Sequence, residues 1–151
     1  MDADARTAAL DSVLELVVLL GEDMARSLAR DGLTTSRAHL LWELLQRGPT
    51  KQQVLAGALG VSARNITGLV DGLVASGFVT REPHPTDRRA TLVSFTDRGA
   101  RTAAAMREGH DELAGLLFGG MTAERYRCFV AGLDEVLAVL RERIALEEAR
   151  A

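Results

Sequence analysis

Cysteine and histidine, the residues from which most metal sites in proteins are built, are scarce in this sequence. Cys128 is the only cysteine, so the chain can form neither an intrachain disulfide nor a thiolate-rich metal site. The three histidines, His39, His84 and His110, are far apart, and no Cys/His pair has the spacing of metal ligands. Unless the fold brings distant histidines together, we expect no metal, and the sequence indicates no other cofactor.

Long apolar runs and catalytic motifs are absent as well. No run approaches the roughly 20 apolar residues that span a bilayer, and the acidic N-terminus lacks the basic start of a signal peptide. We therefore expect a cytoplasmic protein with no membrane partner. The sequence contains no Gly-x-Ser-x-Gly motif, no phosphate-binding glycine loop and no isolated carboxylate pair on an apolar background, so we predict no catalytic residues and no enzyme.

Charge is distributed unevenly along the 151 residues, which have the length of one domain. The net charge is −3, yet residues 48–101 hold seven basic and four acidic side chains, and the rest of the chain carries −6. A basic centre with acidic flanks suits a protein that binds phosphate with one surface. Chance clustering is the alternative that charge alone leaves open.

Apolar side chains at three- and four-residue steps predict long helices near both ends of the chain, over residues 6–31 and 122–148. The apolar stripe of the first helix is wider than one face needs, and the seam of the last is longer than a small monomer requires. A further helix is predicted from Thr96, its N-cap, to about Phe118. We expect the two end helices to form a dimer through Leu10, Val13, Leu133, Leu137, Leu140 and Ile144.

Three short helices are predicted in the central segment. A threonine or serine at positions 34–36 caps the first, Thr50 caps the second over residues 51–59, and Ser62 caps the third. A tight Gly60-Val61-Ser62 turn separates the second helix from the third. Two short helices joined by such a turn have the spacing of a helix-turn-helix.

The third short helix has the composition of a recognition helix, which enters the major groove and reads base edges. Arg64 can donate two hydrogen bonds to a guanine, Asn65 can bind an adenine in the same manner, and Gly68 would permit close approach to the groove. A solvated surface of an amphipathic helix is the alternative. The apolar face is formed by Ile66, Leu69, Val70, Leu73 and Val74, and the polar face by Arg64, Asn65, Thr67, Gly68 and Asp71.

A β-hairpin is predicted directly after this helix. Residues 78–82 and 91–95 are rich in β-branched and aromatic residues, and two prolines stiffen the polar loop between them. Asp87-Arg88-Arg89 lies at its tip, where an arginine can enter the minor groove. Asp87 is expected to hold an arginine by a charge-assisted hydrogen bond; an ordinary surface ion pair is the alternative.

With these motifs the chain resembles the multiple antibiotic resistance regulator (MarR) family. The flanking helices match the layout of that family, so the resemblance covers nearly the whole chain. It implies a dimer of winged-helix subunits on a near-palindromic operator, and repression relieved by a small, often phenolic or aromatic, ligand. The matching motifs are Gly60-Val61-Ser62, Leu69-Val70-Asp71-Gly72-Leu73, Gly77-Phe78-Val79, Asp87-Arg88-Arg89 and Thr96-Asp97-Arg98-Gly99.

The resemblance also assigns roles to matching positions: base reading to Arg64, Asn65 and Thr67, a phosphate contact to Ser62, and the wing arginine to Arg89, braced by Asp87. A capping box would place Glu or Gln where the chain has Asn65, which leaves this side chain available to DNA. Lys51 is the only lysine, so phosphate contacts must rest on arginine, amides and hydroxyls. The predicted DNA-binding set is Ser62, Ala63, Arg64, Asn65, Thr67, Gly68, Asp87, Arg88 and Arg89.

In the MarR family the usual effector crevice is bounded by the first helix, the second helix and the helix after the wing. His39 and Trp42 lie on the second helix and are candidates to line it, with core or interface packing as the alternative for Trp42. Redox sensors of the family carry the reactive thiol near the start of the first helix. Cys128 lies on the last helix, beside Phe129, and is expected to be buried and inert.

The sequence thus predicts a mainly α fold with a small β-hairpin wing, in which residues 33–96 form the winged helix-turn-helix DNA-binding region. Residues 1–32 and 97–151 form the helical dimerisation region of the same compact domain. The predicted function is that of a homodimeric, ligand-responsive repressor of transcription. The alternative is a winged-helix module for protein interaction without sequence-specific DNA binding. The operator, the regulated genes, the effector and the sign of regulation are not determined by the sequence.

Overall fold

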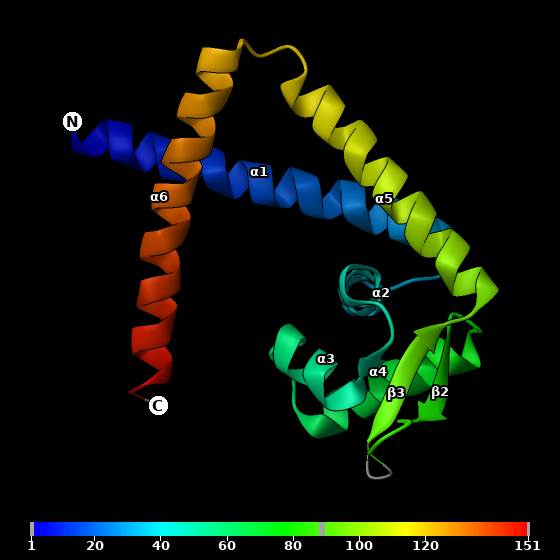
Figure 1. The fold of residues 1–151 in the computed structure, drawn as a ribbon. Coiled ribbons are helices and arrows are strands. Elements are labelled where there is room, and N and C mark those ends of the chain that lie inside the picture. The colour runs from blue at the N-terminus through cyan, green and yellow to red at the C-terminus, as the bar shows by residue number, and fades with distance from the viewer. Residues whose placement is uncertain (1, 88–89, 151) are drawn as a thin grey trace. The chain divides into compact units, whose positions relative to one another are not determined.

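A computed structural model of the protein describes residues 2–87 and 90–150. The chain divides into two compact units, residues 1–106 and 107–151, and the boundary between them falls within helix α5. The described elements follow one another in the order α1, α2, β1, α3, α4, β2, β3, α5 and α6 (Figure 1). Arg88 and Arg89, which were predicted to form the wing tip, lie outside the described residues.

Four helices open the first unit: α1 (Ala3–Arg30), α2 (Thr35–Arg47), α3 (Gln52–Leu59) and α4 (Ala63–Ala75). Their positions confirm the predicted helices to within a few residues at each end. In Figure 1, α2, α3 and α4 lie together beside the sheet. Their apolar faces and the start of the hairpin enclose one core, whose largest fully buried side chains are Phe78, Leu40, Leu41, Leu44, Leu55, Ile66, Leu73, Val70, Val79 and Val93.

The sheet has three antiparallel strands in the order β1-β3-β2, where only the hairpin was predicted. β2 (Val79–Pro83) and β3 (Thr91–Phe95) form the wing, and β1 (Thr50–Lys51) pairs with the other edge of β3. Two residues are too few to carry a period-2 pattern, so periodicity gave no sign of β1. This strand joins the wing to the start of α3.

The prediction that Thr50 caps α3 is therefore wrong. Its backbone pairs with Val93, and its hydroxyl donates to the Gly48 carbonyl oxygen at 2.7 Å. The N-cap position of α3 belongs to Lys51, whose side chain makes no capping bond. The turn at Gly48 (φ 73°) brings a carbonyl oxygen close to the Thr50 hydroxyl. The hydrogen bond to this oxygen competes with capping, in which the hydroxyl would accept from a helix amide.

The start of α5 (Asp97–Phe118) is fastened to the turn between α4 and β2. Thr96, its predicted cap, accepts a hydrogen bond from the Gly99 amide at 3.0 Å and donates to the Gly77 carbonyl oxygen at 2.7 Å. Arg98 donates to the Ser76 carbonyl oxygen at 2.7 Å and lies 4.4 Å above the Phe78 ring. The motif at residues 96–99 thus closes the winged helix onto α5, and we call this set of contacts the α5 clasp.

The second unit consists of the end of α5 and helix α6 (Ala123–Glu148). Thr122 caps α6, since its hydroxyl accepts from the Arg125 amide at 3.3 Å. Near the turn, the Phe118 ring packs against Tyr126 and Phe129 with ring centroids 5.9 and 5.7 Å apart. None of the α6 side chains that the structure describes is fully buried.

Gly99 has no room for a side chain inside the α5 clasp. A Cβ at this position would lie 1.8 Å from the Phe78 carbonyl oxygen, which is a backbone atom that cannot rotate away. We predict that Gly99→Ala destabilises the fold by about 1–3 kcal/mol or more, the usual range for overpacking. Thermal unfolding followed by circular dichroism measures this effect.

Gly57→Ala is the matched control, because Gly57 lies within α3 and an added Cβ meets nothing within 4 Å. Replacing a helical glycine with alanine in open space is expected to leave stability unchanged or to raise it by up to about 1 kcal/mol. Equal effects of the two substitutions would show that the clasp does not hold Gly99 as described.

Candidate nucleic-acid interface

The turn before α4 places the beginning of this helix on the surface. Gly60 adopts the left-handed conformation (φ 64°) that ends α3, and Ser62 caps α4 by accepting a hydrogen bond from the Asn65 amide at 3.2 Å. The cap predicted for Ser62 is confirmed. The contact residues predicted at this end of α4 are all exposed. They are Ser62, Ala63, Arg64, Asn65, Thr67 and Gly68.

The buried face of α4 is narrower than predicted. Ile66, Val70 and Leu73 are buried, and Leu69 is half-buried. Val74, which was placed on the packed face, is 40% exposed, so this prediction is wrong. The buried stripe runs along positions 66, 70 and 73, and residue 74 lies at its edge, where the core does not reach.

Arg64 and Thr67 differ in what their side chains can still offer to a ligand. Among the described residues, the Arg64 side chain has neither a hydrogen bond nor an ion pair, and the residue is exposed, so its guanidinium donors face solvent. The Thr67 hydroxyl donates to the Ala63 carbonyl oxygen at 2.8 Å and accepts from the Gln52 side chain at 3.0 Å. Thr67 can therefore present a lone pair and a methyl group, but its donor is used within the protein.

Arg81 joins three elements in a polar network that motif reasoning did not reveal. From β2 its guanidinium donates to the Gln52 side chain at 3.2 Å, to the Thr67 carbonyl oxygen at 3.2 Å, and to the Asp71 carboxylate. Gln52 begins α3, while Thr67 and Asp71 lie on α4. We call these four residues the Arg81 network. In the sequence, Arg81 is only one of the basic residues of the central segment. Its partners are distant in the chain, so no local pattern indicates them.

Lys51 makes a second contact of this kind at the wing loop. Its ammonium group lies 3.1 Å from the Asp87 carboxylate, and both side chains are partly exposed. The only lysine of the chain thus connects β1 to the wing loop. The predicted brace between Asp87 and Arg89 falls on a residue outside the described ones and stays a prediction.

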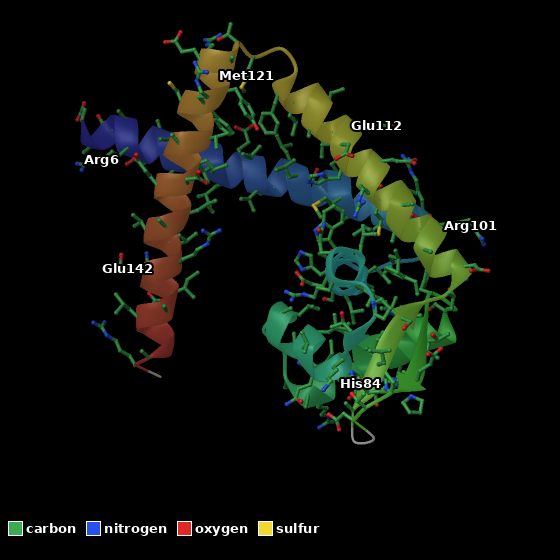
Figure 2. The ribbon with its side chains drawn as sticks, in the orientation of Figure 1. Arg6, His84, Arg101, Glu112, Met121 and Glu142 are labelled. Carbon is green, nitrogen blue, oxygen red and sulfur yellow. The ribbon has the colours of Figure 1, made fainter. Side chains whose placement is uncertain are left out.

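The described part of the wing loop is held by short-range hydrogen bonds. The His84 amide donates to the Ala90 carbonyl oxygen at 3.0 Å, and the Ala90 amide donates to that of Asp87 at 2.9 Å. The Thr86 amide donates to Nδ1 of His84 at 3.3 Å. Figure 2 shows His84 beside the end of the hairpin.

Between α4 and the wing the surface is hollowed. A pocket of about 390 Å³ is bounded by α3, the start of α4 and the wing loop. Its polar lining includes residues of both polar contacts. Gln52 and Thr67 belong to the Arg81 network, and Lys51 and Asp87 form the ion pair at the wing loop. The complete lining is Lys51, Gln52, Gln53, Ala56, Ala63, Ile66, Thr67, Asp87, Ala90 and Thr91.

The residues predicted for other roles are placed as follows. On α2, His39 is exposed and Trp42 is half-buried, which leaves their predicted effector role untested. Cys128 is exposed, so the prediction of a buried thiol is wrong; the α6 side chains next to it in the chain are exposed as well. The predicted dimer residues are all at least partly exposed: Leu10 57%, Val13 39%, Leu133 37%, Leu140 50% and Ile144 47%, with Leu137 half-buried.

The part of the chain that the structure describes contains no group of three or more His, Cys, Asp or Glu side chains that could hold a metal ion. None of its helices is both long enough and apolar enough to cross a membrane.

Two packed helices with an exposed second helix, followed by a two-stranded wing, define a winged helix-turn-helix protein. The MarR family model matches residues 33–91 of the chain. An uncharacterized HTH-type transcriptional regulator of Mycobacterium leprae is 33% identical over 113 residues, which cover 74% of this chain and 77% of the relative. The chain therefore belongs to the MarR family and is a transcriptional regulator; this family consists of regulators rather than enzymes.

Two further comparisons bear on the fold and on the kind of regulator. The HTH-type transcriptional repressor NicR of Pseudomonas putida is 33% identical over 91 residues, 60% of this chain and 58% of NicR. The crystal structure of Streptococcus pneumoniae FabT in complex with DNA matches with a TM-score of 0.79 at 18% identity, over 93% of this chain and 99% of that chain. At this identity the second comparison shows the shared fold.

The cap of α4 gives a prediction that concerns stability alone. Ser62→Ala removes the acceptor of the Asn65 amide and should destabilise the protein by about 1 kcal/mol, the usual cost of losing an N-cap. Ser62→Asp retains an acceptor at the same place and should stay close to the parent protein. Denaturant titrations measure both, and an alanine variant as stable as the aspartate variant would contradict the role of the cap.

Proposed function

We propose that the protein represses transcription as a cytoplasmic homodimer that binds a near-palindromic operator. In each subunit α4 lies in a major groove and the wing reaches the adjacent minor groove. Successive major grooves on one side of the duplex are about 34 Å apart, so the dimer must hold its two α4 helices at that spacing. Residues 33–96 would form the DNA-binding region, and residues 1–32 and 97–151 the dimerisation region.

The exposed beginning of α4 is the observation that carries this proposal. It offers Arg64 and Asn65 to solvent next to a helix N-terminus, where amides and the helix dipole favour phosphate. Arginine and asparagine are the side chains that pair with guanine and adenine edges. The hollow beside α4 is bounded by the wing loop, so a duplex strand can pass between the two contacting elements. The positive charge of residues 48–101 supports the same surface.

The unpartnered apolar faces of the end helices support the homodimer. Only Leu28 is buried among the 28 residues of α1, and large apolar side chains such as Val17 (63%) and Val18 (57%) are exposed. On α6, Val136, Leu140 and Ile144 are each about half exposed. Helices of this length gain stability chiefly by packing an apolar face, and a second copy of the chain supplies the same faces.

Repression and its relief are the finer part of the proposal. The name of the relative NicR describes a repressor, and a protein bound over an operator blocks transcription without further chemistry. We propose that a small phenolic or aromatic effector binds beside α2, with His39 and Trp42 as lining candidates. Differential binding of the effector to one dimer geometry would change the spacing of the two α4 helices and release DNA.

Selection of bound sequences from random duplex DNA tests the proposal directly. The selected sequences should contain two inverted half-sites about one helical turn apart, bound about 10³-fold or more tightly than a scrambled duplex. Affinity should fall steeply with salt. Weak binding that is blind to sequence would contradict the proposal and favour a protein-interaction module.

Arg64→Ala should lower the affinity for the selected operator by about 1–3 kcal/mol and relax the preference at one base position, because one base contact is lost. Fluorescence anisotropy with the operator and its single-base variants measures both effects. Arg107→Ala, at an exposed arginine of α5 outside the proposed surface, is the matched control and should bind as the parent does. A loss of equal size in the two variants would place the base contact elsewhere.

Leu140→Glu should dissociate the dimer, since a carboxylate buried in an apolar interface without a partner is strongly unfavourable. The substitution is expected to leave the fold of each subunit intact because Leu140 is 50% exposed. Ala131→Glu adds the same charge nine residues away, about two and a half turns, and therefore on the opposite face of α6. Sedimentation velocity should show a monomer for the first variant and a dimer for the control; two dimeric variants would place the interface elsewhere.

A further inference from the structure

We infer that Arg81 is a positioning residue for base reading, which acts through the Arg81 network and not by contact with DNA. Its guanidinium would set the orientation of α4 relative to α3 and the wing, and hence the direction in which Arg64 and Asn65 enter the groove. This inference rests on the proposed function, since it names a residue that determines the sequence specificity of the same surface.

The register of the sheet explains why Arg81 reaches α3 and α4. Arg81 on β2 and Thr50 on β1 both pair with Val93, so the three side chains share one face of the sheet. Val93 is fully buried on that face. The Arg81 stem therefore leaves the sheet toward the core, and its charged head emerges between the helices, where the side chain retains 29% exposure.

The contacts of the guanidinium form a closed circuit. Three different nitrogens donate, Nε to Gln52, Nη2 to the Thr67 carbonyl oxygen and Nη1 to Asp71, while the Gln52 amide donates to the Thr67 hydroxyl. A planar group bonded in three directions fixes its partners in angle as well as in distance. The circuit joins β2, the first residue of α3 and the middle of α4, so none of these elements can turn without breaking a bond.

The position of the network on α4 connects it to base reading. Thr67 and Asp71 are four residues apart and share one face of the helix, and Arg64 lies three residues before Thr67 on the same strip. Two of the three side chains on this strip are held by Arg81 or Gln52, and the third points to solvent with its donors available. A rotation of α4 that releases Thr67 and Asp71 would therefore also turn Arg64 away from its base.

The same contacts argue against a direct phosphate contact by Arg81. Its Nε, Nη1 and Nη2 atoms each donate to a protein acceptor, and its charge is opposed by the Asp71 carboxylate. Asp71 is itself 58% exposed at the surface proposed for DNA, where an unpaired carboxylate would repel phosphate. Arg81 thus both orients α4 and neutralises an acidic group that faces the duplex.

The test uses the full-length protein and the selected operator, with a scrambled duplex of the same composition as reference. Arg81→Lys keeps the positive charge but replaces a rigid fork with a single flexible ammonium, which cannot reach three acceptors at once. We expect the ratio of the two affinities to fall about tenfold. The dependence of affinity on salt should stay as in the parent protein, because the positive charge is retained.

Asp71→Asn is the second variant, because it weakens the same network without shortening any side chain. It should also reduce the affinity ratio, while binding to the scrambled duplex stays equal or increases. Arg47→Lys is the matched control: Arg47 also pairs with a carboxylate, Glu43 at 2.8 Å, but both residues belong to α2. This control should leave the affinity ratio unchanged.

Each other outcome refutes the inference in a recognisable way. An unchanged affinity ratio in Arg81→Lys and Asp71→Asn would show that the network does not position the base-reading residues. Parallel weakening on both duplexes with an unchanged thermal midpoint would make Arg81 a phosphate contact. Parallel weakening with a lowered thermal midpoint would make its role purely structural. A parent protein without sequence preference would refute the proposed function itself, and this inference with it.

Discussion

The contact between Gly99 and the carbonyl oxygen of Phe78 is the constraint on which the architecture of the first unit depends. The backbone of α5 approaches that of the α4–β2 turn so closely that a Cβ would lie 1.8 Å from the Phe78 oxygen. Thr96 and Arg98 hydrogen-bond the carbonyl groups of Gly77 and Ser76 at the same place. Because the Phe78 side chain is itself part of the core, the helix-turn-helix, the wing and α5 meet at one rigid junction. Any displacement of α5 must therefore reach the end of α4.

A second constraint acts at the other side of α4. The Arg81 network holds the middle of this helix against β2 and α3, while the clasp holds its end. The polar residues of α4 consequently fall into two groups. Thr67 and Asp71 are bonded within the protein, whereas Arg64 remains available to a ligand. The proposed base-reading surface needs this division, because a side chain contributes to specificity only if the helix that carries it is held in one orientation.

The end helices differ from the winged core in where their apolar side chains lie. The winged core buries its apolar residues, but α1 and α6 leave theirs largely exposed. In the proposed dimer a second copy covers these faces, so that folding of the helices and dimerisation are one event. Since α5 begins at the clasp, the proposed dimerisation region is connected to α4 through covalent structure and short-range contacts. In this proposal an effector that alters dimer geometry has a physical route to α4.

Much of this arrangement could be predicted from residues close together in the chain. The caps at Ser62 and Thr96, the turn at Gly60 and the periodicity of the long helices act over three or four residues, so the sequence determines them by itself. For the first short helix the sequence left positions 34–36 open, and the structure selects Thr34. The sequence also identifies the side chains proposed to read DNA. Tertiary structure alone decided that Thr50 joins the sheet, that Val74 and Cys128 remain exposed, and that Arg81 and Lys51 find partners 29 and 36 residues away. The physical reason is that strand pairing and ion pairing between distant segments depend on which surfaces the core brings together, and no local pattern records that choice.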